Sequence, residues 1–156
     1  MKDTTTIKIL LADDDKDDCL FFKEALEELT LNAELTTVND GEQLMQHLET
    51  ITGNLPHALF LDLNMPRKNG FDCLIEIKNH SVLKHIPVII HSTSYIEEKA
   101  NELFNGGAHY YICKPSNFEE LKNVVHKAIM LVTENNAQVT KDYFLINQPK
   151  KSNHRK

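Results

Sequence analysis

The sequence predicts an α/β domain with a doubly wound, five-stranded parallel sheet and helices on both faces. Five short apolar segments alternate with five longer amphipathic segments along the chain. The short segments are apolar throughout rather than at every second residue, which is typical of parallel strands covered on both faces. Because crossovers between parallel strands are right-handed, five successive βα units place helices on both sides of the sheet.

The strands are predicted where the apolar runs occur, at residues 7–12, 35–38, 58–61, 88–90 and 110–113. Between these runs, apolar side chains recur every three or four residues, as on one face of a helix. The predicted helical faces are Cys19, Phe22, Leu26 and Leu29; Leu44, Leu48 and Ile51; Phe71, Leu74 and Ile77; Leu103 and Phe104; and Leu121, Val124, Val125, Ala128 and Ile129. Capping boxes predict helix starts at Asp40, Ser94 and Ser116, and Gly106 and Gly107 are expected to end the fourth helix.

The composition fits a single domain with a C-terminal extension. With 156 residues, of which 41% are hydrophobic and 26% charged, the chain can bury a substantial core. We expect residues 5–133 to form the domain and the mostly polar residues 134–156 to form the extension. Residues 143–146 of the extension are apolar, so we expect them to dock on their own domain or on a second protomer. Residues after Pro149 are expected to be mobile.

Charge, hydropathy and cysteine usage exclude several classes of protein. The net charge of −6 argues against nonspecific nucleic-acid binding, which depends on basic surfaces. The basic residues at 150–156 are expected to be a solvated tail. No run approaches the roughly 20 apolar residues of a membrane span, and no signal peptide is recognisable. Cys19, Cys73 and Cys113 lie far apart, as buried thiols of a reducing compartment would. These features predict a cytoplasmic protein without a membrane or nucleic-acid partner.

Functional side chains are expected beyond the carboxyl ends of the strands, where open α/β sheets form their sites. The first strand is followed by Asp13 and Asp14, the third by Asp62, the fourth by Ser92 and the fifth by Lys114. Together with the βα alternation, this chemistry predicts a flavodoxin-like strand order, 2-1-3-4-5, that brings these residues together. Each feature alone has a simpler interpretation: the acidic run at 13–18 as a helix start, and residues 92–94 as a capped loop.

Converging carboxylates repel one another unless a cation joins them. Mg²⁺ suits such a site, because it prefers carboxylate and carbonyl oxygens and leaves room for phosphate. Asp62 could then attack a phosphoryl donor and form an acyl phosphate. Lys114 and the metal would neutralise charge on the transferred group, and Ser92 could donate a hydrogen bond to it.

These residues resemble the receiver domain of bacterial two-component response regulators, in particular the single-domain, chemotaxis-type members. The resemblance covers about residues 5–133, and its pieces are ILLADDD at 9–15, LFLDLNMPRKNG at 59–70, PVIIHSTS at 87–94 and YYICKPS at 110–116. It implies that Asp62 is the phospho-acceptor, that Asp14 binds Mg²⁺ directly and that Asp13 acts largely through water. The backbone carbonyl of Asn64 would be a further ligand.

The resemblance also implies a switch and its partners. Ser92 matches the switch hydroxyl, Tyr111 the switch aromatic and Lys114 the phosphate-contacting lysine, and Pro115 would follow a cis peptide bond. The implied function is a phosphorylation-dependent signalling switch that catalyses only its own phosphorylation and dephosphorylation. The phosphoryl group would come from a histidine kinase or a histidine phosphotransfer protein. The output would be contact with a downstream protein or a phosphorelay, and a homodimer is compatible with this.

Three alternatives stay open on the sequence. An aspartate-nucleophile phosphatase of the haloacid-dehalogenase kind would need an acid two residues after the nucleophile, where this chain has Asn64. A nucleotide-binding module would need a glycine-rich or Walker motif, and neither is present. A scaffold that acts without phosphorylation would need none of the residues at the strand ends. The sequence names no kinase, stimulus or target.

Overall fold

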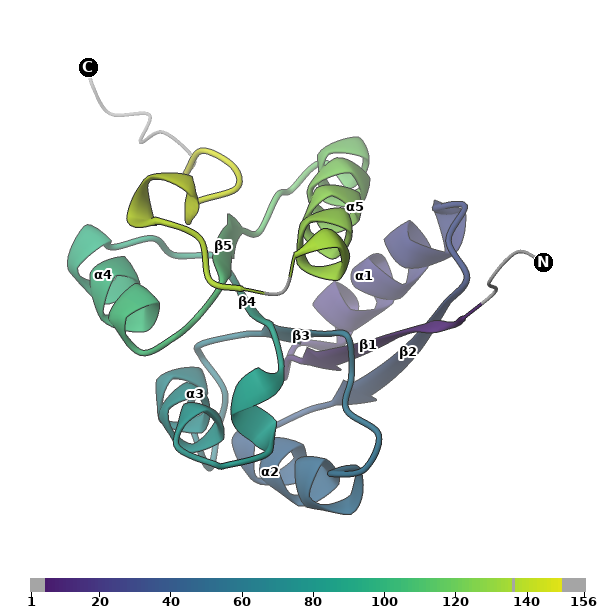
Figure 1. The fold of residues 1–156 in the computed structure, drawn as a ribbon. Coiled ribbons are helices and arrows are strands. Elements are labelled where there is room, and N and C mark those ends of the chain that lie inside the picture. Colours follow the sequence, from purple (N-terminus) through teal and green to yellow (C-terminus); the bar gives the residue numbers. More distant parts are fainter. Residues whose placement is uncertain (1–4, 136, 150–156) are drawn as a thin grey trace.

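The computed structural model describes residues 5–135 and 137–149 and contains a five-stranded parallel sheet (Figure 1). The strands are β1 (Ile7–Ala12), β2 (Ala33–Val38), β3 (Ala58–Leu61), β4 (Val88–Ser92) and β5 (Tyr110–Cys113). Their order is β2-β1-β3-β4-β5, so the predicted fold class and strand order are confirmed. Three strands have the predicted bounds, whereas β2 begins two residues earlier and β4 ends two residues later than predicted.

Two layers of helices cover the sheet. The helices are α1 (Lys16–Glu28), α2 (Gly41–Thr50), α3 (Gly70–Lys78), α4 (Glu97–Asn105) and α5 (Phe118–Glu134), with 3-10 turns η1 (Leu83–His85) and η2 (Lys141–Tyr143). Helices α1 and α5 lie on one face, and α2, α3 and α4 lie on the other (Figure 1). In the part of the chain that is described, no helix combines the length and hydrophobicity that crossing a bilayer requires.

The alternation of side chains along the strands divides the core in two. Leu10, Leu59 and Ile90 face α2, α3 and α4, while Leu11, Phe60 and Ile89 face α1 and α5. Both sets are almost fully buried. Central strands that are apolar at every position therefore have a hydrophobic layer on each side, which is why their sequence pattern predicted a parallel sheet.

The helix caps agree only partly with the predicted capping boxes. Asp40 caps α2 by accepting a hydrogen bond from the Gln43 amide at 2.8 Å, as predicted. The caps predicted at Ser94 and Ser116 are wrong. Helix α4 starts after Ile96 without a side-chain cap, and α5 is capped by Asn117, whose side chain accepts from the Glu120 amide. Asn is at least as good an N-cap as Ser, so a start one residue later costs nothing locally.

The C-terminal extension folds back on its own domain and lies beside β5 and α4, drawn in yellow in Figure 1. The Tyr111 amide donates to the Phe144 carbonyl, and the Ile146 amide donates to the Tyr111 carbonyl, both at 2.9 Å. Phe144 is buried and packs edge-on against Phe104. Self-docking, one of the two predicted outcomes, is confirmed, although Tyr143 stays 72% exposed. The prediction for the residues after Pro149 falls outside the described residues.

Candidate functional site

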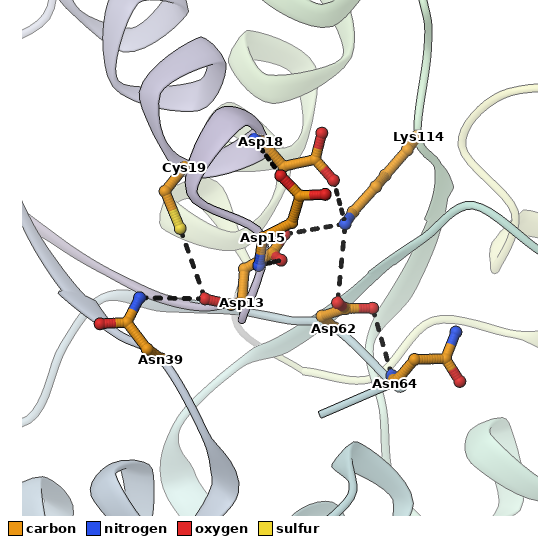
Figure 2. A network of polar contacts seen from close by, with 8 residues as sticks. All are labelled: Asp13, Asp15, Asp18, Cys19, Asn39, Asp62, Asn64 and Lys114. Carbon is orange, nitrogen blue, oxygen red and sulfur yellow. Dashed lines mark hydrogen bonds and ion pairs between the residues drawn. The ribbon is translucent and has the colours of Figure 1, made fainter. Parts of the chain in front are cut away.

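The site lies at the carboxyl edge of the sheet, where backbone hydrogen bonds continue beyond the strand ends. The Asp13 amide donates to the Val38 carbonyl at 3.1 Å, and the Asp62 amide donates to the Ala12 carbonyl at 2.9 Å. The Lys114 amide donates to the Ser92 carbonyl at 2.8 Å. These bonds fix the backbone of the first residue after β1, β3 and β5, so that their side chains converge at one edge (Figure 2).

Asp62 is buried at the floor of this site. One carboxylate oxygen accepts a hydrogen bond from the Asn64 amide at 3.3 Å, and the residue is only 5% exposed. Burial disfavours the charged form and raises the pKa of Asp62 to about 6, although the neighbouring Lys114 ammonium opposes the shift. The Asp62 carboxylate is therefore more basic than an exposed one.

The backbone at Gly70, eight residues after Asp62, lies too close to the Asp62 backbone for any side chain. A Cβ atom built at this position would lie 2.3 Å from the Asp62 carbonyl oxygen and 2.8 Å from the Leu63 Cα. The Gly70 amide also donates to the Leu63 carbonyl at 3.0 Å. The start of α3 can therefore pack directly on the backbone that carries Asp62 only because position 70 has no side chain.

Lys114 supplies the positive charge of the site. Its ammonium lies 2.8 Å from the Asp13 carboxylate, 2.8 Å from that of Asp18 and 3.6 Å from that of Asp62 (Figure 2). Burial of the side chain lowers the pKa of Lys114, but its bonds to Asp13 and Asp18 and the charge of Asp62 outweigh this and raise the pKa above its usual range. Lys114 therefore stays protonated throughout the physiological range.

Asp18 was missed by the sequence analysis. It lies in the first turn of α1 and donates its backbone amide to the Asp15 side chain, which is the N-cap of that helix. The acidic run was interpreted as a helix start, and Asp15 and Asp18 do occupy such positions. Its spacing, one helical turn after Asp14, does not by itself show which residue of the acidic run reaches Lys114.

Three carboxylates could hold a divalent cation. Oxygen atoms of Asp13, Asp14 and Asp62 all lie within 4.8 Å of one another, with Asp14 exposed and the other two buried. All of these donors are hard oxygens, and the exposed side leaves room for water or phosphate, so the residues fit Mg²⁺ or a similar ion. The excess of carboxylate over the single Lys114 ammonium is a second reason for a cation here.

The two predicted switch residues lie beside the site, Ser92 at the end of β4 and Tyr111 within β5. Ser92 is fully buried, and its hydroxyl has no hydrogen-bond partner among the described residues. Tyr111 is 1% exposed, donates its hydroxyl to the Ser94 carbonyl and packs edge-on against Tyr95. Burial raises the pKa of Tyr111 to about 12, so it remains a neutral donor.

The peptide bond before Pro115 differs from the prediction. No cis peptide bond occurs in the described part of the chain, so the predicted cis bond is wrong. The trans isomer is intrinsically favoured before proline by about 0.5–1 kcal/mol. With this trans bond, the Lys114 side chain already reaches both Asp13 and Asp18.

Comparisons with known proteins agree with this geometry. Residues 9–126 match the family described as response regulator receiver domain. Response regulator Rcp1 of Synechocystis sp. is 34% identical over 121 residues, which cover 75% of this chain and 82% of that protein.

Solved structures of related regulators have the same fold. The phosphorylated cyanobacterial phytochrome response regulator RcpA is 35% identical with a TM-score of 0.74, and the match covers 85% of this chain and 97% of that one. The Mn²⁺-bound form of Rcp1 is 29% identical with a TM-score of 0.68, covering 86% and 96% of the two chains. The family match spans most of the chain and includes every residue of the site described above. This chain therefore belongs to the response regulator receiver domain family.

Proposed function

We propose that this chain is a signalling switch that accepts a phosphoryl group on Asp62 from a partner histidine kinase or histidine phosphotransfer protein. Membership of the receiver family implies phosphorylation-dependent signalling. The observation that carries the assignment to Asp62 is its position: a buried carboxylate 3.6 Å from the Lys114 ammonium and grouped with Asp13 and Asp14. Asp14 is exposed and lies on the solvent side of this group, so a donor can approach from there.

In the proposed step, a carboxylate oxygen of Asp62 attacks phosphorus while the bond from phosphorus to the donor nitrogen breaks, and the nitrogen keeps that electron pair. Lys114 balances the negative charge on the transferred group. Asp13, Asp14, Asp62 and the backbone carbonyl of Asn64 would hold Mg²⁺. When bound, this ion would offset the repulsion between the carboxylates and the incoming phosphate.

The output is proposed to depend on Ser92 and Tyr111. A phosphoryl oxygen on Asp62 is a new acceptor for the Ser92 hydroxyl, which has no partner in the described structure. Such a hydrogen bond shifts the equilibrium between two conformations only if it is stronger in one conformation than in the other. Residues 5–133 would carry this switch in the cytoplasm and signal to a downstream protein, along a relay or through a homodimer.

Phosphorylation is tested directly by incubating the chain with acetyl phosphate and Mg²⁺ and measuring the intact mass. One added phosphoryl group that maps to Asp62, and that is absent in Asp62→Asn, is the expected result. Asp72→Asn is the matched control, because Asp72 is an exposed carboxylate in the first turn of α3. An unmodified chain would favour a scaffold that acts without phosphorylation. Turnover of added phosphomonoesters would favour a phosphatase, for which Asn64 is the wrong residue.

A further inference from the structure

The Lys114 ammonium is bound mainly by carboxylates other than the proposed acceptor. An ammonium group has three N–H donors. One of them donates to the Asp18 carboxylate at 2.8 Å. The Asp13 carboxylate forms an ion pair at 2.8 Å, and Asp62 lies at 3.6 Å, beyond a normal hydrogen bond. Asp18 therefore takes an N–H donor of Lys114 that could otherwise bind a phosphoryl group on Asp62.

The two carboxylates that bind Lys114 differ in burial. The Asp13 side chain is 1% exposed and comes from the end of β1, whereas the Asp18 side chain is 36% exposed and comes from the first turn of α1. The Lys114 side chain is 8% exposed, so it is confined by its surroundings as well as by these two partners. Without Asp18, Asp13 would still keep the ammonium in the site.

We propose that Asp18 is a positioning residue that restrains Lys114 and thereby slows phosphoryl transfer to Asp62. The inference rests on the proposed function and adds a regulator of its rate. Phosphoryl transfer depends on positioned positive charge, so an ammonium shared with Asp18 stabilises the transferred group less than a free one. Removing Asp18 would release this N–H donor towards Asp62, while the ion pair with Asp13 keeps the ammonium in the site.

The neighbouring Asp17 provides a matched control. It lies in the same first turn of α1 and carries the same charge, but it is exposed and makes no ion pair with Lys114. Replacing either residue by alanine removes one negative charge and one carboxylate from the helix start. Both changes keep the backbone amides, so Asp15 can still cap the helix through the amide of residue 18. Only Asp18→Ala frees Lys114.

The test is the rate of Mg²⁺-dependent phosphorylation by acetyl phosphate as a function of donor concentration. We expect Asp18→Ala to raise the limiting rate roughly two- to fivefold, the range that a partly exposed ion pair can supply. Asp17→Ala should change only the donor concentration at half-saturation, since it alters the general charge alone. Asp18→Glu restores a carboxylate that can reach Lys114 and should bring the limiting rate back towards that of the wild type.

The outcomes separate this inference from the proposed function. If the wild-type chain takes up no phosphoryl group on Asp62, the proposed function fails and the role of Asp18 fails with it. If the wild type is phosphorylated but Asp18→Ala matches Asp17→Ala, or is slower than the wild type, only the restraint by Asp18 is refuted. A faster Asp18→Ala with no rescue by Asp18→Glu would also refute it.

Discussion

The amide of Tyr111 donates a hydrogen bond to the carbonyl of Phe144 at 2.9 Å, which joins β5 to the C-terminal extension. The Asn147 side chain continues this pairing, since it accepts from the Cys113 amide at 2.9 Å and donates to the Cys113 carbonyl at 2.8 Å. The edge of the sheet at β5 is thus paired along its length, which removes a site for unwanted strand addition. The same bonds attach the extension to the backbone of a proposed switch residue.

Phe144 should be the main anchor of the extension. It is 4% exposed and contacts the rings of Phe104 and Tyr111. We expect Phe144→Ala to lower the free energy of unfolding by about 3–5 kcal/mol, because it removes a buried aromatic ring. Tyr143→Ala is the control: its side chain is 72% exposed, and the loss should stay below about 0.5 kcal/mol. Urea unfolding followed by circular dichroism measures both, and equal losses would contradict the anchor.

A chain that ends at Glu134 should fold and still take up phosphate on Asp62. All of the proposed site residues precede the extension, and the truncated chain retains α5, which forms the core on one face of the sheet together with α1. Stability should fall by about as much as in Phe144→Ala, since the rest of the extension depends on that anchor. Circular dichroism and the acetyl phosphate assay check this. A truncated chain that is folded but cannot be phosphorylated would show that the extension takes part in the chemistry.

The strands were predictable because burial on both faces leaves a continuous apolar signal. Strand β2 lacks this signal at its start. It is an edge strand of the sheet, and Glu34 and Thr36 are exposed, so its first two residues do not form an apolar run. The cap at Ser116 was mispredicted because Asn117, an equally good cap, is its neighbour, and the cap at Ser94 because α4 starts two residues later without a side-chain cap. That choice depends on how the helix packs, which local sequence does not contain.

The composition of the site was predictable because parallel strands end at one edge. The sequence analysis named Asp13, Asp14, Asp62, Ser92 and Lys114, and these lie at the same edge of the sheet. Their detailed partners were not predictable. Which residue of the acidic run reaches Lys114 depends on the orientation of α1 against β5, two elements separated by most of the chain. The role of Asp18 therefore required coordinates.

Ser92 should affect the response to phosphorylation more than phosphorylation itself. Ser92→Ala leaves Asp62 and Lys114 in place, so the phosphoryl group should still be taken up. Losing one charge-assisted hydrogen bond of about 1.5–3 kcal/mol should reduce the phosphorylation-induced change in conformational ratio by roughly ten- to a hundredfold. The measurement is the NMR shift of the Tyr111 amide before and after acetyl phosphate. Ser94→Ala is the control, because Ser94 binds Tyr111 through its backbone carbonyl, and a full response in Ser92→Ala would argue against the switch.

His91 should destabilise the chain. It is buried against Phe22 and Phe60, and neither ring nitrogen has a hydrogen-bond partner in the described structure. His91→Val suits a central strand and should raise the free energy of unfolding by about 1–2 kcal/mol at neutral pH. The exposed His126, replaced by alanine, serves as the control. If His91→Val does not raise the free energy of unfolding at any pH, the ring nitrogens of His91 have hydrogen-bond partners in solution.

The pH dependence of the His91 effect has a defined sign. Burial lowers the pKa of His91 from 6.5 to about 3. The unfolded chain therefore binds a proton that the folded chain does not, and the wild type loses stability as the pH falls below 6.5 towards 3. The advantage of His91→Val should thus be larger at pH 5.5 than at pH 7.5, by about 1 kcal/mol.

Asp62 should show the opposite dependence. Its pKa is raised by burial from 3.8 to about 6, so the folded chain holds a proton more tightly than the unfolded chain does. The stability that this proton provides is present below pH 4 and is lost as the pH rises through 6. Above pH 6 the folded state carries a buried, desolvated carboxylate whose pairing with Lys114 is incomplete.

Asp62→Asn should therefore stabilise the metal-free chain, and more so at pH 7.5 than at pH 4.5. We expect a difference of up to about 2 kcal/mol between these two gains, from the shift of roughly two pKa units. Lys114 keeps Asp13 and Asp18 as partners in this variant, so the loss of the third carboxylate leaves no unpaired charge. Urea unfolding in the presence of a chelator measures the gain, with the exposed Asp72→Asn as control. If the gain in the free energy of unfolding over the wild type is the same at pH 7.5 and at pH 4.5, Asp62 is not desolvated in solution.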